Sequence, residues 1–428
     1  MIGAIADDFT GGTDVAVAFR RAGLRTVVLF GGASDRGDLP THDAIVIALK
    51  TRTIEPEVAV SESVQAAQWL RDHGATQIFF KFCSTFDSKP EGNIGPVADA
   101  LADLLDAPRA VVVPSSPEHL RTQYMGHLFV DRQLLSDSPM RHHPLTPMTD
   151  SYIPRVLETQ TLRTVGLIDH RSVRRGAEEV ARLLDEQQSA GVRYSVVDAV
   201  DDADLAAIGR ACADDVLVTG AAGLAGGLGL AHAARLVDDA HTRIEELHSD
   251  PIGDVDSAVL AGSCSARTLE QISDMQRGHD SYLLDAVATP DAASLATQAL
   301  AWFDARPSTS VPLIYSSLPP AQLRRAQETL GTERASAILE GAMGIIARGL
   351  VARGVQRLVI AGGETSGAVV TALEVDGGVI GEEAAPGVPW IYTTGSRQIA
   401  LLLKSGNFGA PDLLTTAVER RSTTEVVA

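Results

Sequence analysis

Short apolar runs alternate with amphipathic stretches along most of the chain. A short apolar run bounded by glycine or small polar residues is typical of a strand buried on both faces of a parallel sheet. Between the runs, apolar residues recur every three or four positions, which predicts helices. We expect strands over residues 1–6, 25–30, 44–48, 77–82, 110–113, 164–168, 194–197 and 216–219. The helices between them are expected over 13–22, 58–71, 96–105, 173–190 and 202–213.

A second series of strands and helices follows residues 241–257, which are rich in acidic residues and form the best linker candidate. Its strands are expected over 258–261, 281–284, 312–315 and 357–361, and its main helices over 266–277 and 334–353. The sequence therefore predicts an α/β protein with two doubly wound domains and largely parallel sheets. We place the domains at residues 1–245 and 246–428 and expect the active site in the cleft between them.

Two segments depart from this alternation. Residues 114–154 are rich in proline and carry several histidines, and we expect a long functional loop there. The glycine-rich stretch after Gly220 lacks the full order of a dinucleotide-binding fingerprint, so close helix packing is its better interpretation. Neither segment has the histidine spacing of a metal site.

Composition narrows the choice of partners. The formal net charge of −19 argues against binding to nucleic acid or to an anionic membrane, because both require a positive surface. We find no targeting segment and no apolar run long enough to cross a bilayer. Cys83, Cys212 and Cys264 lack metal-like spacing, so we expect reduced thiols in a cytoplasmic protein. A homo-oligomer is compatible with the sequence.

Acidic residues follow the first predicted strand directly. Asp7 and Asp8 lie at its carboxyl end, where open α/β sheets bind ligands, and Asp14 is a further carboxylate in the same motif. Such a carboxylate can take a proton from a hydroxyl group or hold a cation. One of the pair could instead cap the following helix. A haloacid-dehalogenase-type phosphatase would need an aspartate two positions after Asp7, where Phe9 stands.

Basic and neutral polar residues follow two other strands. Arg52 comes after the third strand and Lys81 lies in the fourth. We expect these two side chains to hold the carboxylate of a polyhydroxylated acid. Further substrate contacts are expected from the segment after the fourth strand, namely Ser84, Lys89 and Asn93, with Asp87 as another candidate carboxylate. The alternative is a solvated loop with helix caps.

The second half contains a strand-to-helix turn suited to phosphate. Gly362 and Gly363 follow a buried strand and precede a helical pattern, so free backbone amides and the helix dipole can meet an anion there. Two other turns, near Ser263 and Gly406, repeat this design. There is no Walker-type loop in the sequence. An ordinary turn remains the alternative for each one alone.

Eight motifs together resemble the four-carbon acid sugar kinase family, and the resemblance spans nearly the whole chain. They are ADDFTGGTD (6–14), KFCSTFDS (81–88), GNIGPV (92–97), HPLTPMTD (143–150), AGSCS (261–265), AGGETS (361–366), APGVPW (385–390) and KSGNFG (404–409). Gly12 stands where the family often has alanine. Lys89 stands where a small polar residue is usual, and this added cation could alter substrate preference.

The resemblance implies an N-terminal sugar-acid domain and a C-terminal ATP domain. It implies transfer of the ATP γ-phosphate to the C4 hydroxyl of 3-oxo-tetronate, with D-threonate or D-erythronate as alternatives. It also places ATP against Ser263, Ser265, Gly362, Gly363, Glu364, Thr365 and Gly406. We expect Mg²⁺ to bridge the phosphates, and Asp8, or else Asp7 or Asp87, to orient or deprotonate the hydroxyl. A sugar-acid sensor and an NAD-dependent dehydrogenase remain the alternatives from other classes.

Overall fold

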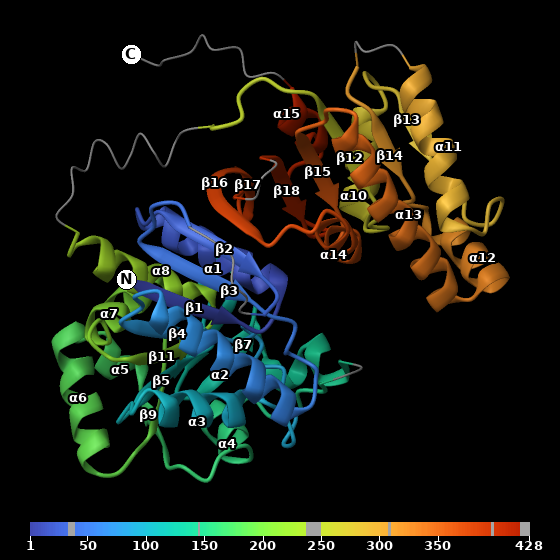
Figure 1. The fold of residues 1–428 in the computed structure, drawn as a ribbon. Coiled ribbons are helices and arrows are strands. Elements are labelled where there is room, and N and C mark those ends of the chain that lie inside the picture. Colours follow the sequence, from blue (N-terminus) through green and yellow to red (C-terminus); the bar gives the residue numbers. More distant parts are fainter. Residues whose placement is uncertain (33–38, 144–145, 237–249, 307–309, 395–397, 420–428) are drawn as a thin grey trace. The chain divides into compact units, whose positions relative to one another are not determined.

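The protein is α/β, with mostly parallel strands and one small antiparallel sheet (Figure 1). The structure, a computed structural model, describes all residues except 33–38, 144–145, 237–249, 307–309, 395–397 and 420–428. The chain divides into two compact units, Met1–Leu247 and His248–Ala428.

In the first unit, the strands of the main sheet are parallel to one another and run in the order β2-β3-β1-β4-β11-β5-β10-β9. Each predicted strand is confirmed to within one residue at either end. Their bounds are β1 (Ile2–Ala6), β2 (Thr26–Phe30), β3 (Ala44–Ala48), β4 (Gln77–Lys81), β5 (Ala110–Val113), β9 (Val165–Ile168), β10 (Tyr194–Val197) and β11 (Leu217–Gly220). Burial of these strands explains why their sequences are continuously apolar.

Helices cover both faces of these strands. On one face of β1 and its neighbour β3, Gly12 of the first helix lies against Ala48, and on the other face Gly3 lies against Leu70. The helix predicted over 173–190 is α6, which begins only at Ala177 because Gly176 before it has φ +102°, and Val173 ends the separate short helix α5. The helices are α1 (Phe9–Arg21), α2 (Pro56–Asp72), α3 (Ile94–Leu104), α4 (Ile153–Glu158), α5 (His170–Val173), α6 (Ala177–Ser189), α7 (Asp202–Ala211) and α8 (Ala222–Ala233).

The glycine-rich stretch after Gly220 forms α8, which packs closely on α7. A Cβ at Gly227 would lie 2.2 Å from the carbonyl oxygen of Leu205, and one at Gly209 would lie 2.3 Å from the carbonyl carbon of Gly227. Only glycine permits two helix backbones to approach so closely. The interpretation of this stretch as a packing element is therefore confirmed.

Part of the segment expected to be an irregular loop is a small antiparallel sheet. It consists of β6 (Arg121–Tyr124), β7 (His127–Val130) and β8 (Gln133–Leu134), preceded by the 3₁₀ helix η1 (Pro117–His119) and followed by η2 (Leu135–Asp137) and η3 (Pro139–His142). The buried carboxylate of Asp198 accepts hydrogen bonds from the backbone amides of Gly126 and His170, at 2.9 and 3.0 Å. This contact ties the β6–β7 turn to the main sheet.

The second unit has the strand order β13-β14-β12-β15-β18-β17-β16. The first five are parallel, but β17 is antiparallel to both of its neighbours. The prediction of a largely parallel sheet missed this β16–β17 hairpin. The bounds are β12 (Ser257–Ala261), β13 (Ser281–Leu283), β14 (Leu313–Tyr315), β15 (Arg357–Ala361), β16 (Gly377–Ala385), β17 (Val388–Thr393) and β18 (Ala400–Lys404).

One helix of the second unit, α13, is long and apolar enough to span a membrane by length and composition alone. The sequence predicted this helix over 334–353, but no apolar run long enough to cross a bilayer. In the structure it packs against α11 and α14, and its apolar face, including Met343, Ile346 and Leu350, is buried. The helices of this unit are α10 (Ala266–Met275), α11 (Ala292–Ala305), α12 (Pro320–Leu330), α13 (Thr332–Ala352), α14 (Gly363–Ala372) and α15 (Leu413–Val418).

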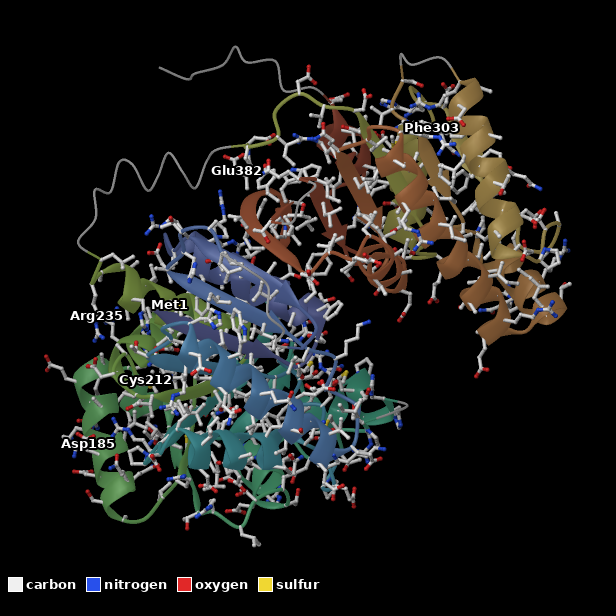
Figure 2. All side chains as sticks on the ribbon, viewed as in Figure 1. Met1, Asp185, Cys212, Arg235, Phe303 and Glu382 are labelled. Atoms are coloured by element: carbon white, nitrogen blue, oxygen red, sulfur yellow. The ribbon has the colours of Figure 1, made fainter. Side chains whose placement is uncertain are left out.

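All three cysteines are free thiols. Cys212, at the carboxyl end of α7, is fully buried (Figure 2). Burial raises the pKa of its thiol well above the ordinary value. Cys212 is therefore a small core residue, as expected.

Candidate active site

Three neighbouring strands of the first unit bring the charged residues of the N-terminal motifs together. β1 lies between β3 and β4, and Ala6 is in register with Ala48 on one side and with Lys81 on the other. Because the strands are parallel, the residues after them gather at one edge of the sheet. Asp7, Arg52 and Lys81 meet there, so the predicted convergence of these strand ends is confirmed.

Asp7 is buried and is paired with two cations. Arg52 donates two hydrogen bonds of 2.8 Å to it, from Nε to Oδ2 and from Nη2 to Oδ1. Lys81 Nζ lies 3.4 Å from Oδ1. Only 5% of Asp7 and 4% of Lys81 are exposed. Since a buried charge without a partner is strongly destabilising, these residues depend on one another.

Asp8 caps the first helix of the unit. Its Oδ1 accepts a 2.8 Å hydrogen bond from the amide of Gly11, and lies 2.7 Å from Arg52 Nη2 and 3.3 Å from Lys81 Nζ. All of these contacts involve Oδ1. Within the described part of the chain Oδ2 accepts no hydrogen bond, and the side chain is 30% exposed. The open question of which aspartate caps α1 is thus answered, and Asp8 keeps one oxygen for a ligand.

Asp7 and its cations hold one another in their ionised forms. Burial raises the pKa of Asp7, but Lys81 and Arg52 outweigh it and the pKa lies below its ordinary value. Burial lowers the pKa of Lys81, but Asp7 and Asp8 outweigh it and the pKa lies above its ordinary value. Sequence reasoning treated Arg52 and Lys81 as free cations, whereas two carboxylates already neutralise them.

Asn93 organises the loop that carries Arg52. Its Nδ2 donates hydrogen bonds to the carbonyl oxygens of Thr51 and Ile54, at 2.7 and 3.2 Å. Ser88 also has a protein partner, because its Oγ accepts a 2.8 Å hydrogen bond from Gln160 Nε2. Of the residues predicted to contact substrate, Asn93 therefore has a structural role in holding the Arg52 loop.

A chain of hydrogen bonds runs along the loop after β4. Asp87 accepts a hydrogen bond of 3.0 Å from Thr85 Oγ1, which lies 3.0 Å from the sulfur of Cys83. Burial raises the pKa of the Cys83 thiol to about 11, so it is neutral. Ser84 is half-buried, and Lys89 is exposed. The loop thus presents mainly uncharged polar groups near the Asp7 cluster.

The second unit repeats the convergence of strand ends. β15 lies between β12 and β18, and Ala361 is in register with Ala261 and with Lys404. Three loops therefore leave the same edge of these strands, at residues 262–265, 362–365 and 405–409. These are the three turns that the sequence singled out.

Glycines let the three loops touch. A Cβ at Gly262 would lie 2.1 Å from Thr365 Oγ1, and one at Gly406 would lie 2.5 Å from Ser263 Oγ. Gly362 has φ +128°, a conformation that other residues rarely adopt. The loops therefore pack in a way that requires glycine, and they bring Ser263, Thr365 and Gly406 together.

One face of α10 fixes the loop after β18. Ser265 caps α10 and donates a 2.6 Å hydrogen bond to the carbonyl oxygen of Gly406, and Thr268 donates another of 2.9 Å. Gln271 Nε2 donates to the carbonyl oxygens of Phe408 and Ala410, at 3.1 and 2.7 Å. Sequence reasoning missed Thr268 and Gln271, although they follow Ser265 at successive intervals of three residues, which marks one helical face.

Lys404 lies beneath this loop. Its Nζ donates hydrogen bonds of 3.0 Å to Thr268 Oγ1 and to the carbonyl oxygen of Gly406. Only 1% of the residue is exposed. Burial, with a smaller effect of Arg267, lowers the pKa of Lys404 to about 8. The ammonium group therefore stabilises the loop from inside.

The amino end of α14 is open. No side chain caps this helix at Gly362, and both Gly363 and Glu364 are exposed. A Cβ at Gly363 would meet nothing within 4 Å. The first amides of a helix lack partners within it, so this end can bind an anion such as phosphate.

One strand-end site combines acidic and basic side chains, and the other is rich in glycine and hydroxyl groups. The first has the chemistry to bind a small polar acid, and the second the chemistry to bind a phosphate. The chain matches the family models of a sugar-binding N-terminal domain over residues 2–228 and a nucleotide-binding C-terminal domain over residues 258–414. It belongs to the four-carbon acid sugar kinase family.

Curated relatives named 3-oxo-tetronate kinase match the chain over nearly its whole length. Those from Pseudomonas fluorescens and Cupriavidus necator are each 45% identical, covering 98% of this chain and 96% and 97% of the relatives. That from Haemophilus influenzae is 39% identical over 97% of this chain and 99% of its own. Membership in a kinase family disfavours the sensor and dehydrogenase alternatives.

Two solved structures share the fold. A crystal structure from Salmonella typhimurium LT2 and one from Haemophilus influenzae are each 37% identical to this chain, with TM-scores of 0.89 and 0.87. Each comparison covers 97% of this chain and 98% of the other. The Salmonella protein was provisionally described as a tRNA synthase, whereas the more similar curated relatives are kinases.

Proposed function

We propose that the protein transfers the γ-phosphate of ATP to the C4 hydroxyl of a four-carbon sugar acid, with 3-oxo-tetronate as the preferred acceptor. The observation that carries this proposal is the uncapped, glycine-lined amino end of α14 beside the Ser263 and Gly406 loops. The names of the curated relatives support the choice of acceptor. Reduced thiols and the need for ATP favour the cytoplasm as its location.

The ATP phosphates are proposed to bind the amides of Gly363, Glu364 and Thr365 at the start of α14. Backbone N–H groups and the helix dipole both attract a polyphosphate at such a position. The hydroxyl groups of Ser263 and Thr365 lie against the neighbouring glycines and can donate further hydrogen bonds. Ser265 and Gly406 then act as the support that keeps this loop in place.

The sugar acid is proposed to bind at the Asp7 cluster of the first unit. Arg52 and Lys81 are proposed to donate hydrogen bonds to the substrate carboxylate, and Asp7 holds both cations in position. Asp8 orients the attacking hydroxyl through Oδ2, the oxygen that the fold leaves open. Ser84, Asn93 and Lys89 lie on or beside the same loops and are proposed to contact the substrate hydroxyls, with Asp87 as a further acceptor.

Mg²⁺ is proposed to accompany ATP. The described residues include no group of three or more metal-binding side chains. This fits a magnesium ion that takes most of its ligands from phosphates and water, with one or two carboxylates from the protein. Glu364 is exposed in the first turn of α14. The pKa of nearby Glu340 is raised, mainly by burial and also by the negative charge of Glu364. Glu364 is the carboxylate that would hold the ion, which neutralises charge on the transferred phosphoryl group.

A coupled ADP-release assay over a panel of four-carbon sugar acids tests the proposal. We expect the highest kcat/KM with 3-oxo-tetronate, and NMR of the product should locate the phosphate at O4. A higher kcat/KM with D-threonate or D-erythronate would reassign the substrate within the family. Absence of ADP release with every acid would contradict the proposal.

A thermal-shift panel tests the nucleotide separately. ATP at 100 times its Kd should stabilise the protein by about 2.7 kcal/mol. Stabilisation by NAD or NADP and none by ATP would contradict the assignment of the second unit to ATP.

A further inference from the structure

Asp14 differs from the other carboxylates at the substrate edge of the first unit. Asp7 accepts hydrogen bonds from Arg52, Asp8 from Gly11, and Asp87 from Thr85. Asp14 is half-buried, and among the residues that the structure describes it forms neither a hydrogen bond nor an ion pair. Its carboxylate oxygens are therefore uncommitted in the folded protein.

Helix geometry places this carboxylate beside Lys81. Asp14 lies three residues after Gly11, so the two share a face of α1. Side chains of a helix lean towards its amino end, so Asp14 leans over the turn that contains Gly11. A Cβ at Gly11 would lie only 1.8 Å from Lys81 Nζ. The Lys81 ammonium group thus fills the place of a Gly11 side chain, on the helix face that Asp14 shares.

The charged groups around Asp14 come from three elements. Burial raises its pKa, Lys81 of β4 and His119 of η1 lower it, and Asp8 and Glu118 raise it, with a net increase. His119 is itself fixed, because its Nδ1 lies 2.9 Å from Ser116 Oγ. A carboxylate with a raised pKa is a stronger base than an ordinary aspartate.

We propose that Asp14 accepts the proton of the attacking hydroxyl, while Asp8 orients that hydroxyl. This inference rests on the proposed function. As the bond from O4 to the γ-phosphorus forms, the O4 proton passes to the Asp14 carboxylate. The bond from the γ-phosphorus to the bridging oxygen breaks, and ADP leaves with its electron pair. Asp14 then returns the proton to solvent after product release.

The test compares Asp14→Asn and Asp14→Glu with the wild-type enzyme. The asparagine keeps the shape of the side chain and removes its basicity, so we expect kcat to fall by about 10²–10⁴-fold. The KM for ATP and the thermal shift with ATP should stay within about twofold, which shows that the variant is folded. The glutamate variant should recover part of kcat. Asp103→Asn, which removes one exposed carboxylate from the same unit, is the charge control and should keep wild-type kcat.

The pH dependence of kcat separates a base from a merely structural residue. Protonation of the base should reduce wild-type kcat at low pH, and Asp14→Asn should lack this acidic limb. An asparagine variant with kcat within about threefold of wild type, or one that keeps the limb, would overturn the inference. A wild-type enzyme that phosphorylates no four-carbon acid would instead overturn the proposed function, so the two failures are distinguishable.

Discussion

Arg52 and Asp7, 45 residues apart in the chain, form a bidentate ion pair at the edge of the first unit's sheet, with two hydrogen bonds of 2.8 Å. Lys81 joins this pair from the neighbouring strand at 3.4 Å. The cations that we assign to the substrate carboxylate are therefore fixed before substrate arrives. Such preorganisation reduces the entropy lost on binding.

Removal of Asp7 should destabilise the protein strongly. Asp7→Ala leaves Arg52 and Lys81 without their main buried partner, and we expect a loss of about 3–5 kcal/mol in the free energy of unfolding. Urea denaturation measures this loss. Asp150 is the matched control, because Arg155 also binds it in bidentate fashion, but with 63% of the Arg155 side chain exposed. Asp150→Ala should cost at most about 1 kcal/mol. Equal losses in the two variants would show that Asp7 is not a buried electrostatic partner.

Gly11 should be irreplaceable for activity. In Gly11→Ala the new methyl group would lie 1.8 Å from Lys81 Nζ and 2.3 Å from Asp8 Oδ1, so both side chains must move. Displacement of binding groups by about 1 Å can cost about 10²-fold in rate, and we expect kcat/KM to fall by that order. Gly226→Ala in α8, where a Cβ meets nothing within 4 Å, is the control. It should keep full activity and gain up to about 1 kcal/mol in stability. An active Gly11→Ala enzyme would contradict the role of Lys81.

Periodicity predicted the parallel strands of both units because a strand buried on both faces needs an apolar residue at every position. β1, β3 and β4 were predicted for that reason, and the convergence of Asp7, Arg52 and Lys81 follows from parallel topology. The β16–β17 hairpin escaped prediction because β16 mixes glycine, glutamate and alanine with only a few apolar residues. The strands β6–β8 are too short for a reliable pattern.

The pairing of side chains could not be predicted from the sequence. A motif shows that Asp7 and Lys81 both end strands, but not that a distance of 3.4 Å will join residues 74 positions apart. The same holds for Ser265 and Gly406, which are 141 positions apart and hydrogen-bonded. The motifs named these residues, but only the coordinates show which of them lie together and which of them support a loop.

Gly363 should matter for ATP and not for folding. The structure leaves space for a Cβ there, so Gly363→Ala should keep the stability of the wild type or exceed it slightly. If the phosphates bind at the start of α14, the methyl group should raise the KM for ATP at least about tenfold while the KM for the sugar acid stays constant. Gly367→Ala, one turn further along α14 and equally free of contacts, is the control and should leave both KM values unchanged. An unchanged KM for ATP in Gly363→Ala would place the phosphates elsewhere.

Lys404 should make stability increase with pH in the alkaline range. Its pKa is about 8 in the folded protein against an ordinary value of 10.5, so between these values the unfolded chain binds more protons than the folded one. The free energy of unfolding must then rise as pH increases from about 8 to about 10.5, by up to about 3 kcal/mol. Urea denaturation at several pH values measures this rise. Lys404→Met should abolish it, whereas Lys89→Met, which removes an exposed lysine, should retain it. Parallel pH profiles for wild type and Lys404→Met would show that burial does not lower the pKa of Lys404, and that its two hydrogen bonds to Thr268 and Gly406 offset the cost of burying its charge.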